Sequence, residues 1–389
     1  MLLEPNIEGR RAALKMLAAG TAALSLSGLA NAVVPEAAQP AKQRATWRDY
    51  SPRARAVVER SLVIDMLALP TLDFGPEAYA HHISAEDVAM FRGCGITGFH
   101  NASGIGGPDA YQGVLTFLAA WQGFVGRNSD LFSVVDKAAD LDRAKRDGKI
   151  AVIMGVQNSE HFLKAGDVKD FYQLGQRCSQ LTYNSQNLIG SGSTDRVDGG
   201  VSDFGVDIIK AMNETGMLID VSHSGDRTTL DAIELSARPI AITHSNCRAL
   251  VDHPRLKTDE AIRKLADKGG VMGITGVRMF VRDKDPTTVE HMVDHIEHVA
   301  KLVGIEHVGI GSDADLNGYD DMPADQLKQL RAAYKASYAF RDKIDIDGFD
   351  HPKKMFDLAE SMIRRGYSDA DIELVLGGNF RRLLGETWV

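Results

Sequence analysis

Three polar side chains follow three short apolar runs of this chain. His223 and His244 each close a run of mostly apolar residues, and Asp313 follows a third one. Neutral imidazoles and carboxylates are common ligands of divalent cations. A carboxylate beside such an ion can also take a proton from water. If these side chains converge in the fold, they predict a metal site suited to hydrolysis.

The elements that would position these side chains are eight short apolar segments separated by helical patterns. Each segment is bounded by Gly, Asp, Ser or Asn, which is typical of buried parallel strands. Eight such units predict a (β/α)₈ TIM barrel, with a doubly wound open sheet as the alternative. No glycine-rich phosphate-binding motif follows a segment, which disfavours a nucleotide-binding fold. The predicted strands cover residues 62–66, 96–100, 150–156, 178–183, 217–222, 240–244, 270–273 and 307–311.

A barrel of this kind would bring the three side chains together. Side chains at the C-terminal ends of parallel barrel strands face one mouth, and neighbouring strands lie about 4.8 Å apart. We therefore expect His223, His244 and Asp313 to lie at that mouth. The polar segment 317–352 is expected to cover it, and the connection between the second and third strands is expected to carry an extra helix.

The N-terminus has the pattern of an export signal. Arg10 and Arg11 precede a weakly apolar, alanine-rich run, and Ala30-Asn31-Ala32 is typical of a cleavage site. We interpret residues 1–32 as a twin-arginine signal, residues 33–50 as a linker and residues 51–389 as one catalytic barrel domain. This predicts a periplasmic or secreted protein. No later run is long and apolar enough to span a bilayer.

Charge and cysteine content narrow the partners. The formal net charge of -9 argues against binding nucleic acid or an anionic membrane. The three cysteines, at positions 94, 178 and 247, fit no zinc motif and are expected to be small buried residues without disulfides. The sequence leaves open whether the protein forms a homodimer, and a small molecule is the expected binding partner.

Several ordered motifs add a resemblance to a known family. The chain resembles the membrane (renal-type) dipeptidases, peptidase family M19, within the amidohydrolase superfamily. The resemblance extends over residues 55–388 and includes the C-terminal motif around Arg381. The matching stretches are 180–184, 220–223, 244–246, 253–255, 269–273, 311–313, 365–368 and 376–379.

The resemblance implies a metal-dependent hydrolase barrel with a binuclear zinc (Zn²⁺) centre that cleaves dipeptides. It implies that His223 and His244 bind one zinc ion, and that Asp313 binds the other and carries protons. It also implies that Arg255 binds the carboxylate of the substrate. A planar guanidinium suits such a contact because it can donate two parallel hydrogen bonds.

The sequence departs from the family at the remaining ligands. Leu67 and Leu69 stand where the first strand should supply a His-x-Asp pair, and leucine cannot bind a metal. Gln157 replaces the bridging glutamate with an uncharged amide. Tyr183 stands in place of the histidine that polarises the scissile carbonyl. These departures argue against a complete binuclear centre.

We therefore predict one metal ion, bound by His223 and His244 with Asp313 or Gln157. A single zinc with three protein ligands and an open position is an ordinary catalytic arrangement. Three other polar residues lie near strand ends and are expected to be structural: Asp65, His100 and His161.

Two further residues are expected to border the substrate pocket. Tyr183 either donates a hydrogen bond to a developing oxyanion or packs beneath Asn184. Asn184 is expected to line the pocket from the loop after the fourth predicted strand.

Three functions remain open at this point. The leading one is hydrolysis of a dipeptide or another small amide that bears a free carboxylate. The second keeps the fold and changes the substrate to a lactam, a cyclic amide or an N-acyl amino acid. The third is a non-catalytic periplasmic binding or accessory protein, for which the Leu67 and Leu69 replacements are the supporting feature.

Overall fold

The computed structural model describes residues 50–68 and 80–388. The predicted signal, the linker as far as residue 49, and Leu69 lie outside the described residues. Tyr50, predicted to end the linker, belongs to the folded part. Its side chain is 5% exposed, and its hydroxyl donates a 2.7 Å hydrogen bond to Asp357.

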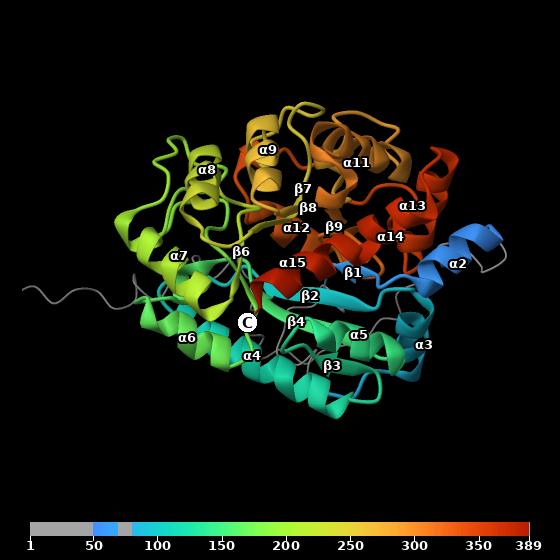
Figure 1. Ribbon diagram of the computed structural model, residues 1–389, viewed down its shortest axis with the longest axis horizontal. Coiled ribbons are helices and arrows are strands. Elements are labelled where there is room, and N and C mark those ends of the chain that lie inside the picture. Colours follow the sequence, from blue (N-terminus) through green and yellow to red (C-terminus); the bar gives the residue numbers. More distant parts are fainter. Residues whose placement is uncertain (1–49, 69–79, 389) are drawn as a thin grey trace, which may run out of the picture.

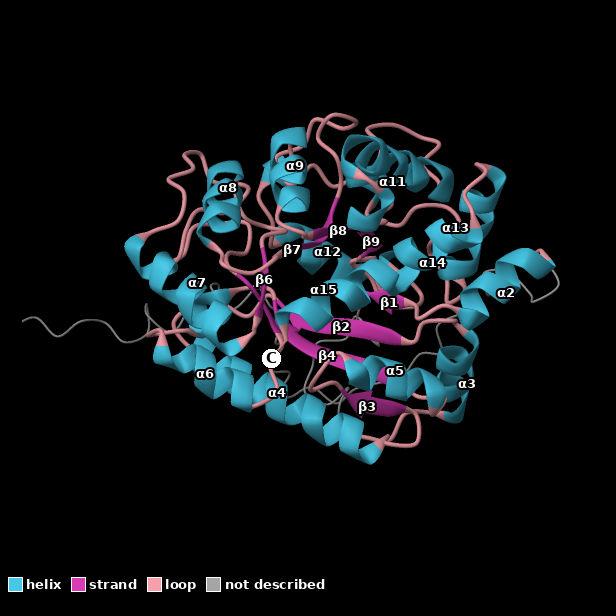
Figure 2. Ribbon diagram, viewed as in Figure 1, coloured by secondary structure: helices cyan, strands magenta, loops and turns pink. Residues whose placement is uncertain are grey.

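Eight parallel strands close into a barrel (Figures 1 and 2). The circle closes where the first strand pairs with the last, at Asp65 and Ile310. The predicted (β/α)₈ barrel is confirmed, and the open doubly wound sheet is wrong. The barrel strands are β1 (Ile64–Asp65), β2 (Gly98–Ser103), β4 (Ile150–Val156), β5 (Cys178–Gln180), β6 (Leu218–Asp220), β7 (Ala241–Ser245), β8 (Val271–Ile274) and β9 (Val308–Ile310).

A ninth strand, β3 (Phe132–Val134), lies outside the closed barrel. It pairs with the first half of β4, while β5 pairs with the last residues of β4. The connection between β2 and β4 therefore contains the expected extra helix and also a strand that sequence analysis missed. A strand of three residues gives too little alternation to be recognised.

Helices surround the barrel, and some of them begin at a capping residue. Ser202 and Thr258 cap α7 and α9 with their side-chain oxygens. The helices are α2 (Pro52–Arg60), α3 (Ala85–Gly93), α4 (Ala110–Arg127), α5 (Ala139–Arg146), α6 (Gly166–Gln173), α7 (Asp203–Thr215), α8 (Asp226–Leu235), α9 (Asp259–Asp267), α10 (Arg278–Val281), α11 (Val289–Val303), α12 (Ala324–Ala332), α13 (Lys354–Arg364), α14 (Asp369–Glu373) and α15 (Asn379–Thr387).

The N-terminal end of the barrel is closed by α15, which crosses the face shown in Figure 1. Phe380, Leu383 and Leu384 pack against inward-facing residues from the starts of the strands, such as Ala151 and Val271. This end is filled with apolar side chains. Polar chemistry is therefore confined to the opposite end, where the strands finish.

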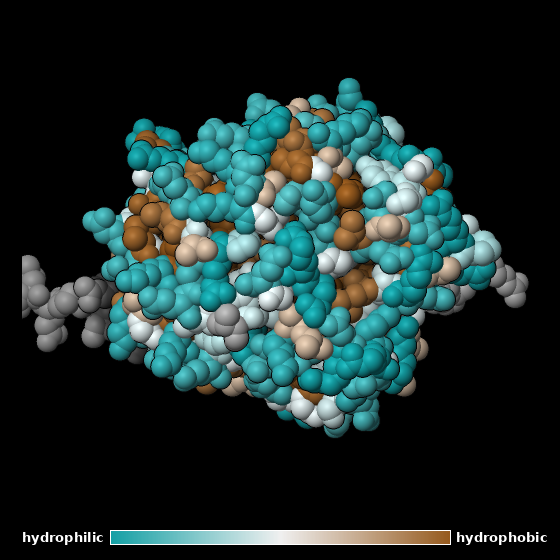
Figure 3. All heavy atoms as spheres, viewed as in Figure 1, coloured by the Kyte–Doolittle hydropathy of each residue, from teal (hydrophilic) through white to brown (hydrophobic). Residues whose placement is uncertain are grey.

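None of the helices in the described parts of the chain has the length and apolar character that crossing a bilayer requires. The face in Figure 3 is largely hydrophilic, with small apolar patches. Leu188 and Val197, in the loop before α7, are among the exposed large apolar residues.

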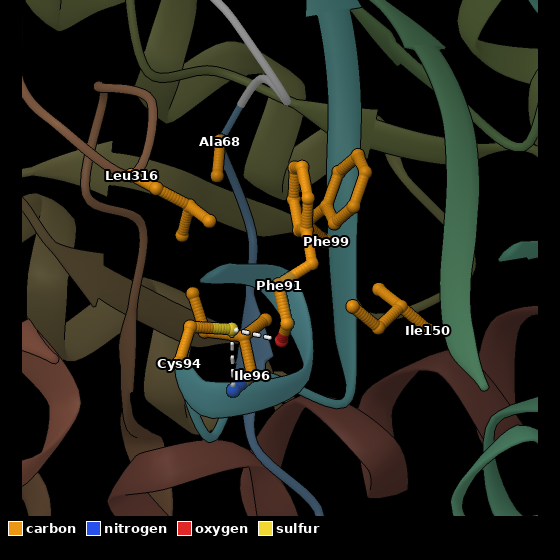
Figure 4. A pocket seen from close by; sticks show the side chains of 7 residues that line it. All are labelled: Ala68, Phe91, Cys94, Ile96, Phe99, Ile150 and Leu316. Carbon is orange, nitrogen blue, oxygen red and sulfur yellow. Dashed lines mark hydrogen bonds between the residues drawn. The ribbon is translucent and has the colours of Figure 1, made fainter. Parts of the chain in front are cut away.

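The three cysteines are buried and free, as predicted. Cys94 borders a small apolar pocket between β1, β2 and α3 (Figure 4). Its thiol donates to the Phe91 carbonyl and accepts from the Ile96 amide, and burial raises its pKa to about 11. Such a thiol is unreactive.

The first prediction concerns Gly155, which faces the inside of the barrel. A Cβ atom there would lie 1.8 Å from Nε2 of His100. His100 cannot easily retreat, because its Nδ1 lies 2.8 Å from the Met66 carbonyl oxygen. Gly155→Ala should lower the free energy of unfolding by about 2–3 kcal/mol in urea titrations. Gly166→Ala is the control, because a Cβ there meets no atom within 4 Å, and equal stability of the two variants would refute the steric argument.

The second prediction concerns Asp345, in the segment between β9 and α13. Burial raises the pKa of this carboxyl to about 7, although the amide of Asp320 hydrogen-bonds to its charged form. Because the folded pKa lies above the unfolded value of about 4, the contribution of Asp345 to stability is largest below pH 4 and is lost as the pH rises to 7. The stability of the wild type relative to Asp345→Asn should therefore fall by about 2–4 kcal/mol between pH 4 and pH 8. Urea titrations at several pH values measure it, with exposed Asp342→Asn as the charge control, and parallel pH curves for wild type and Asp345→Asn would contradict it.

Candidate active site

The two predicted histidines meet at the mouth of the barrel. His223 follows β6 and His244 lies near the end of β7. Their Nε2 atoms are 2.9 Å apart, and both side chains are buried. The convergence expected from the strand ends is therefore present for this pair.

A buried carboxylate fixes the orientation of His244. Thr243 donates its hydroxyl proton to Asp220 Oδ2 over 2.6 Å, so its oxygen is left as an acceptor. The Nδ1 atom of His244 lies 2.8 Å from that oxygen and must donate to it. Asp220 also accepts from the Ser222 hydroxyl and amide. Asp220 therefore orients Thr243, and Thr243 holds the proton of the neutral His244 ring on Nδ1. The Nε2 atom of His244 is left without a proton.

Asn184 orients His223 in the same way. Its Oδ1 lies 2.7 Å from His223 Nδ1, and it also accepts from the Ser193 hydroxyl. Because the side-chain oxygen of Asn184 can only accept, His223 donates from Nδ1. Its Nε2 then carries a lone pair. Asn184 has a φ of 59°, a conformation that asparagine tolerates better than most residues.

The two lone pairs suit a shared cation. Their separation of 2.9 Å would let both nitrogens hold the same divalent ion. Burial, followed by the charge of Arg255, lowers the pKa of both histidines well below its ordinary value. Metal binding requires this neutral form. The pair therefore fits one side of a single ion.

The other predicted ligands do not complete a preformed cage. Within residues 50–68 and 80–388, no three side chains of His, Cys, Asp or Glu are grouped to hold a metal ion. Leu67 is buried and offers only its carbonyl, which accepts from the amide of Asp313. Gln157 donates from Nε2 to the Ala102 carbonyl, and its buried Oε1 has no partner among the described residues. The residues present therefore fit one ion and do not fit the binuclear centre of the family.

Asp313 lies on the same mouth and has the character of a proton carrier. Burial raises its pKa to about 7, the charge of Asp65 adds to this effect, and the charge of Arg255 opposes it. Tyr319 donates a hydrogen bond to it. A carboxyl with this pKa exchanges its proton near neutral pH.

Tyr183 covers the histidine pair. Its ring stacks on His223 with a centroid distance of 4.3 Å and an interplanar angle of 19°. Its hydroxyl lies 2.7 Å from the hydroxyl of Tyr334. Tyr334 and Tyr338 belong to the segment that follows β9, and their rings lie 4.5 Å apart. Sequence analysis placed this segment over the mouth but missed its tyrosines, because nothing in their spacing marks them.

Arg255 is buried beneath the same two strand ends. Its two terminal nitrogens donate to the carbonyls of Ser222 and His244, and its Nε has no partner among the described residues. The guanidinium therefore holds the backbone beside both histidines, and its Nε–H is not used in these contacts. Its contact with a substrate carboxylate stays a prediction.

Of the three residues expected to be structural, only His161 has all its polar side-chain atoms paired, because Asp65 Oδ2 and His100 Nε2 have no partner among the described residues. His161 packs between Phe162 and Phe171, and both of its nitrogens have partners. Asp65 accepts a 2.7 Å hydrogen bond from the Ser312 amide.

Comparisons with known proteins agree with the fold. The model of the membrane dipeptidase family, peptidase family M19, matches residues 75–332. The dipeptidase verJ of Clonostachys rogersoniana is 30% identical over 66% of this chain, and the match covers 61% of verJ. The chain thus matches about three fifths of the length of that relative.

Solved structures show the same architecture. An amidohydrolase from Pseudomonas aeruginosa has a TM-score of 0.75 and 30% identity, and the match covers 86% of this chain and 99% of that chain. The probable dipeptidase PvdM from Pseudomonas aeruginosa has a TM-score of 0.72 and 24% identity, with 87% and 99% covered. With an amidohydrolase-type barrel and a family model that matches most of its length, the chain belongs to the membrane dipeptidase family, peptidase family M19.

Proposed function

We propose that this protein is an exported, metal-dependent hydrolase that cleaves a dipeptide or a related small amide with a free carboxylate. The observation that carries the proposal is the approach of two histidine Nε2 atoms to 2.9 Å at the mouth of the barrel. The name of the relative verJ, a dipeptidase, supports the substrate class. Arg10 and Arg11 support export through the twin-arginine route.

One divalent ion, zinc by analogy with the family, would be held by His223 and His244. Gln157 brings an oxygen that has no other partner among the described residues, and is the proposed third ligand. Such an ion would supply a Lewis acid at the scissile carbonyl and would lower the pKa of water.

The chain's own residues orient the substrate and move its protons. Arg255 Nε, which has no partner among the described residues, donates to the substrate carboxylate. The Asp313 carboxylate accepts a proton from the attacking water and returns it to the leaving amine nitrogen. Tyr183, whose hydroxyl lies 2.7 Å from that of Tyr334, donates its proton to the developing oxyanion.

A second substrate class is favoured by the apolar character of the first strand. Leu67 stands where the resemblance places a metal ligand, and this apolar side chain cannot balance the free ammonium group of a dipeptide. An N-acyl amino acid or a lactam lacks that ammonium and keeps the carboxylate. We retain this class as the alternative, and a homodimer remains open.

The test is metal content and turnover of the full chain and of His223→Ala. The wild type should bind one zinc per chain and hydrolyse at least one dipeptide or N-acyl amino acid in a panel. His223→Ala should lose the zinc and at least about 10³-fold of kcat/KM, since a metal ligand is removed. His298→Ala is the matched control, because His298 pairs with Asp259 at the surface.

Three results would contradict the proposal. Two zinc ions per chain would refute the mononuclear site. Unchanged turnover in His223→Ala would refute the role of the pair. Absence of both zinc and turnover, with ligand-induced stabilisation, would favour the non-catalytic binding protein.

A further inference from the structure

A buried lysine holds the turn that carries His223. Lys257 is 1% exposed, and its ammonium group donates to the carbonyls of Val221 and Ser224 over 2.7 and 2.8 Å. The third proton goes to the hydroxyl of Thr229, 3.0 Å away. Three donors meet three acceptors, so the group is fully satisfied.

Arg255 and Lys257, which belong to the same loop, donate to different carbonyls of this turn. Arg255 takes the carbonyl of Ser222, between the two carbonyls that Lys257 takes. The remaining carbonyl, that of His223, accepts from the Ser193 amide over 2.8 Å. Every carbonyl from residue 221 to residue 224 therefore has a fixed donor, and Lys257 supplies the donor for two of them.

The same loop is attached to the strand that carries His244. The amide of Lys257 donates to the Asn246 carbonyl, and the Lys257 carbonyl accepts from the Arg248 amide. The Ser245 hydroxyl donates to the Arg255 carbonyl. Lys257 thus connects the end of β7, which carries His244, to the turn after β6, which carries His223.

We propose that Lys257 is a positioning residue of the metal site, whose side chain fixes the turn after β6 so that His223 Nε2 faces His244 Nε2. The proposal rests on the proposed function for its catalytic consequence. Its structural part, the immobility of the turn, does not depend on a metal. Burial lowers the pKa of Lys257 to about 7, but the neutral amine still has two N–H donors for the two carbonyls.

The test compares Lys257→Met with Lys268→Met in the full chain. Methionine keeps much of the length of the side chain and removes the donors. Lys268 is a matched control because it also holds two carbonyls, those of Glu234 and Ser236, at the far end of α8.

The first readout is hydrogen exchange in metal-free protein. The amides of Ser193 and Ser224, which donate to carbonyls of this turn, should exchange at least about 10-fold faster in Lys257→Met and unchanged in Lys268→Met. Unchanged exchange at both amides in Lys257→Met would overturn the proposal, whether or not the protein is a hydrolase.

The second readout is zinc affinity, measured by competition with a chelator, together with the kinetics. Lys257→Met should bind zinc 10–100-fold more weakly, the usual cost of losing an outer-shell contact, and should lose kcat with little change in KM. Wild-type affinity in Lys257→Met would refute the positioning role. If the variant does not fold, Thr229→Val, which removes one acceptor, should show the same changes at smaller size, and wild-type exchange in it would overturn the proposal.

Discussion

The approach of two histidine Nε2 atoms to 2.9 Å is the constraint on which the rest of the site depends. Two lone pairs repel at this distance unless a cation or a proton lies between them. The surroundings hold both rings in place: Asp220 acts through Thr243 on one ring, and Asn184 acts on the other. The buried hydrogen bonds that hold both rings support the proposal that this pair binds a cation.

Sequence analysis could place residues at strand ends but could not give distances between side chains. The barrel, its mouth and the histidine pair follow from apolar runs and the geometry of parallel strands. Asp313 does reach the mouth, yet it forms no three-ligand group with the pair. The stacking of Tyr183 on His223 and its contact with Tyr334 depend on how a long segment folds back over the mouth. Periodicity carries no information about such a contact, nor about the short strand β3.

The charges around the mouth support the proposal of one ion rather than two. The family pattern has a bridging glutamate and a first-strand aspartate, and this chain has Gln157 and residues without charge at those positions. Arg255 and Lys257 are buried nearby, and the described partners of both are carbonyl and hydroxyl oxygens. A second divalent cation would meet this positive charge without the glutamate and the first-strand aspartate that balance it in the family pattern.

Anomalous X-ray diffraction at the zinc edge, on crystals of the zinc-loaded full chain, tests the central claim most directly. The account predicts one anomalous peak per chain, within about 2.0–2.1 Å of the Nε2 atoms of both His223 and His244. Two peaks in the barrel mouth, or a single peak that leaves either histidine unbound, would contradict it.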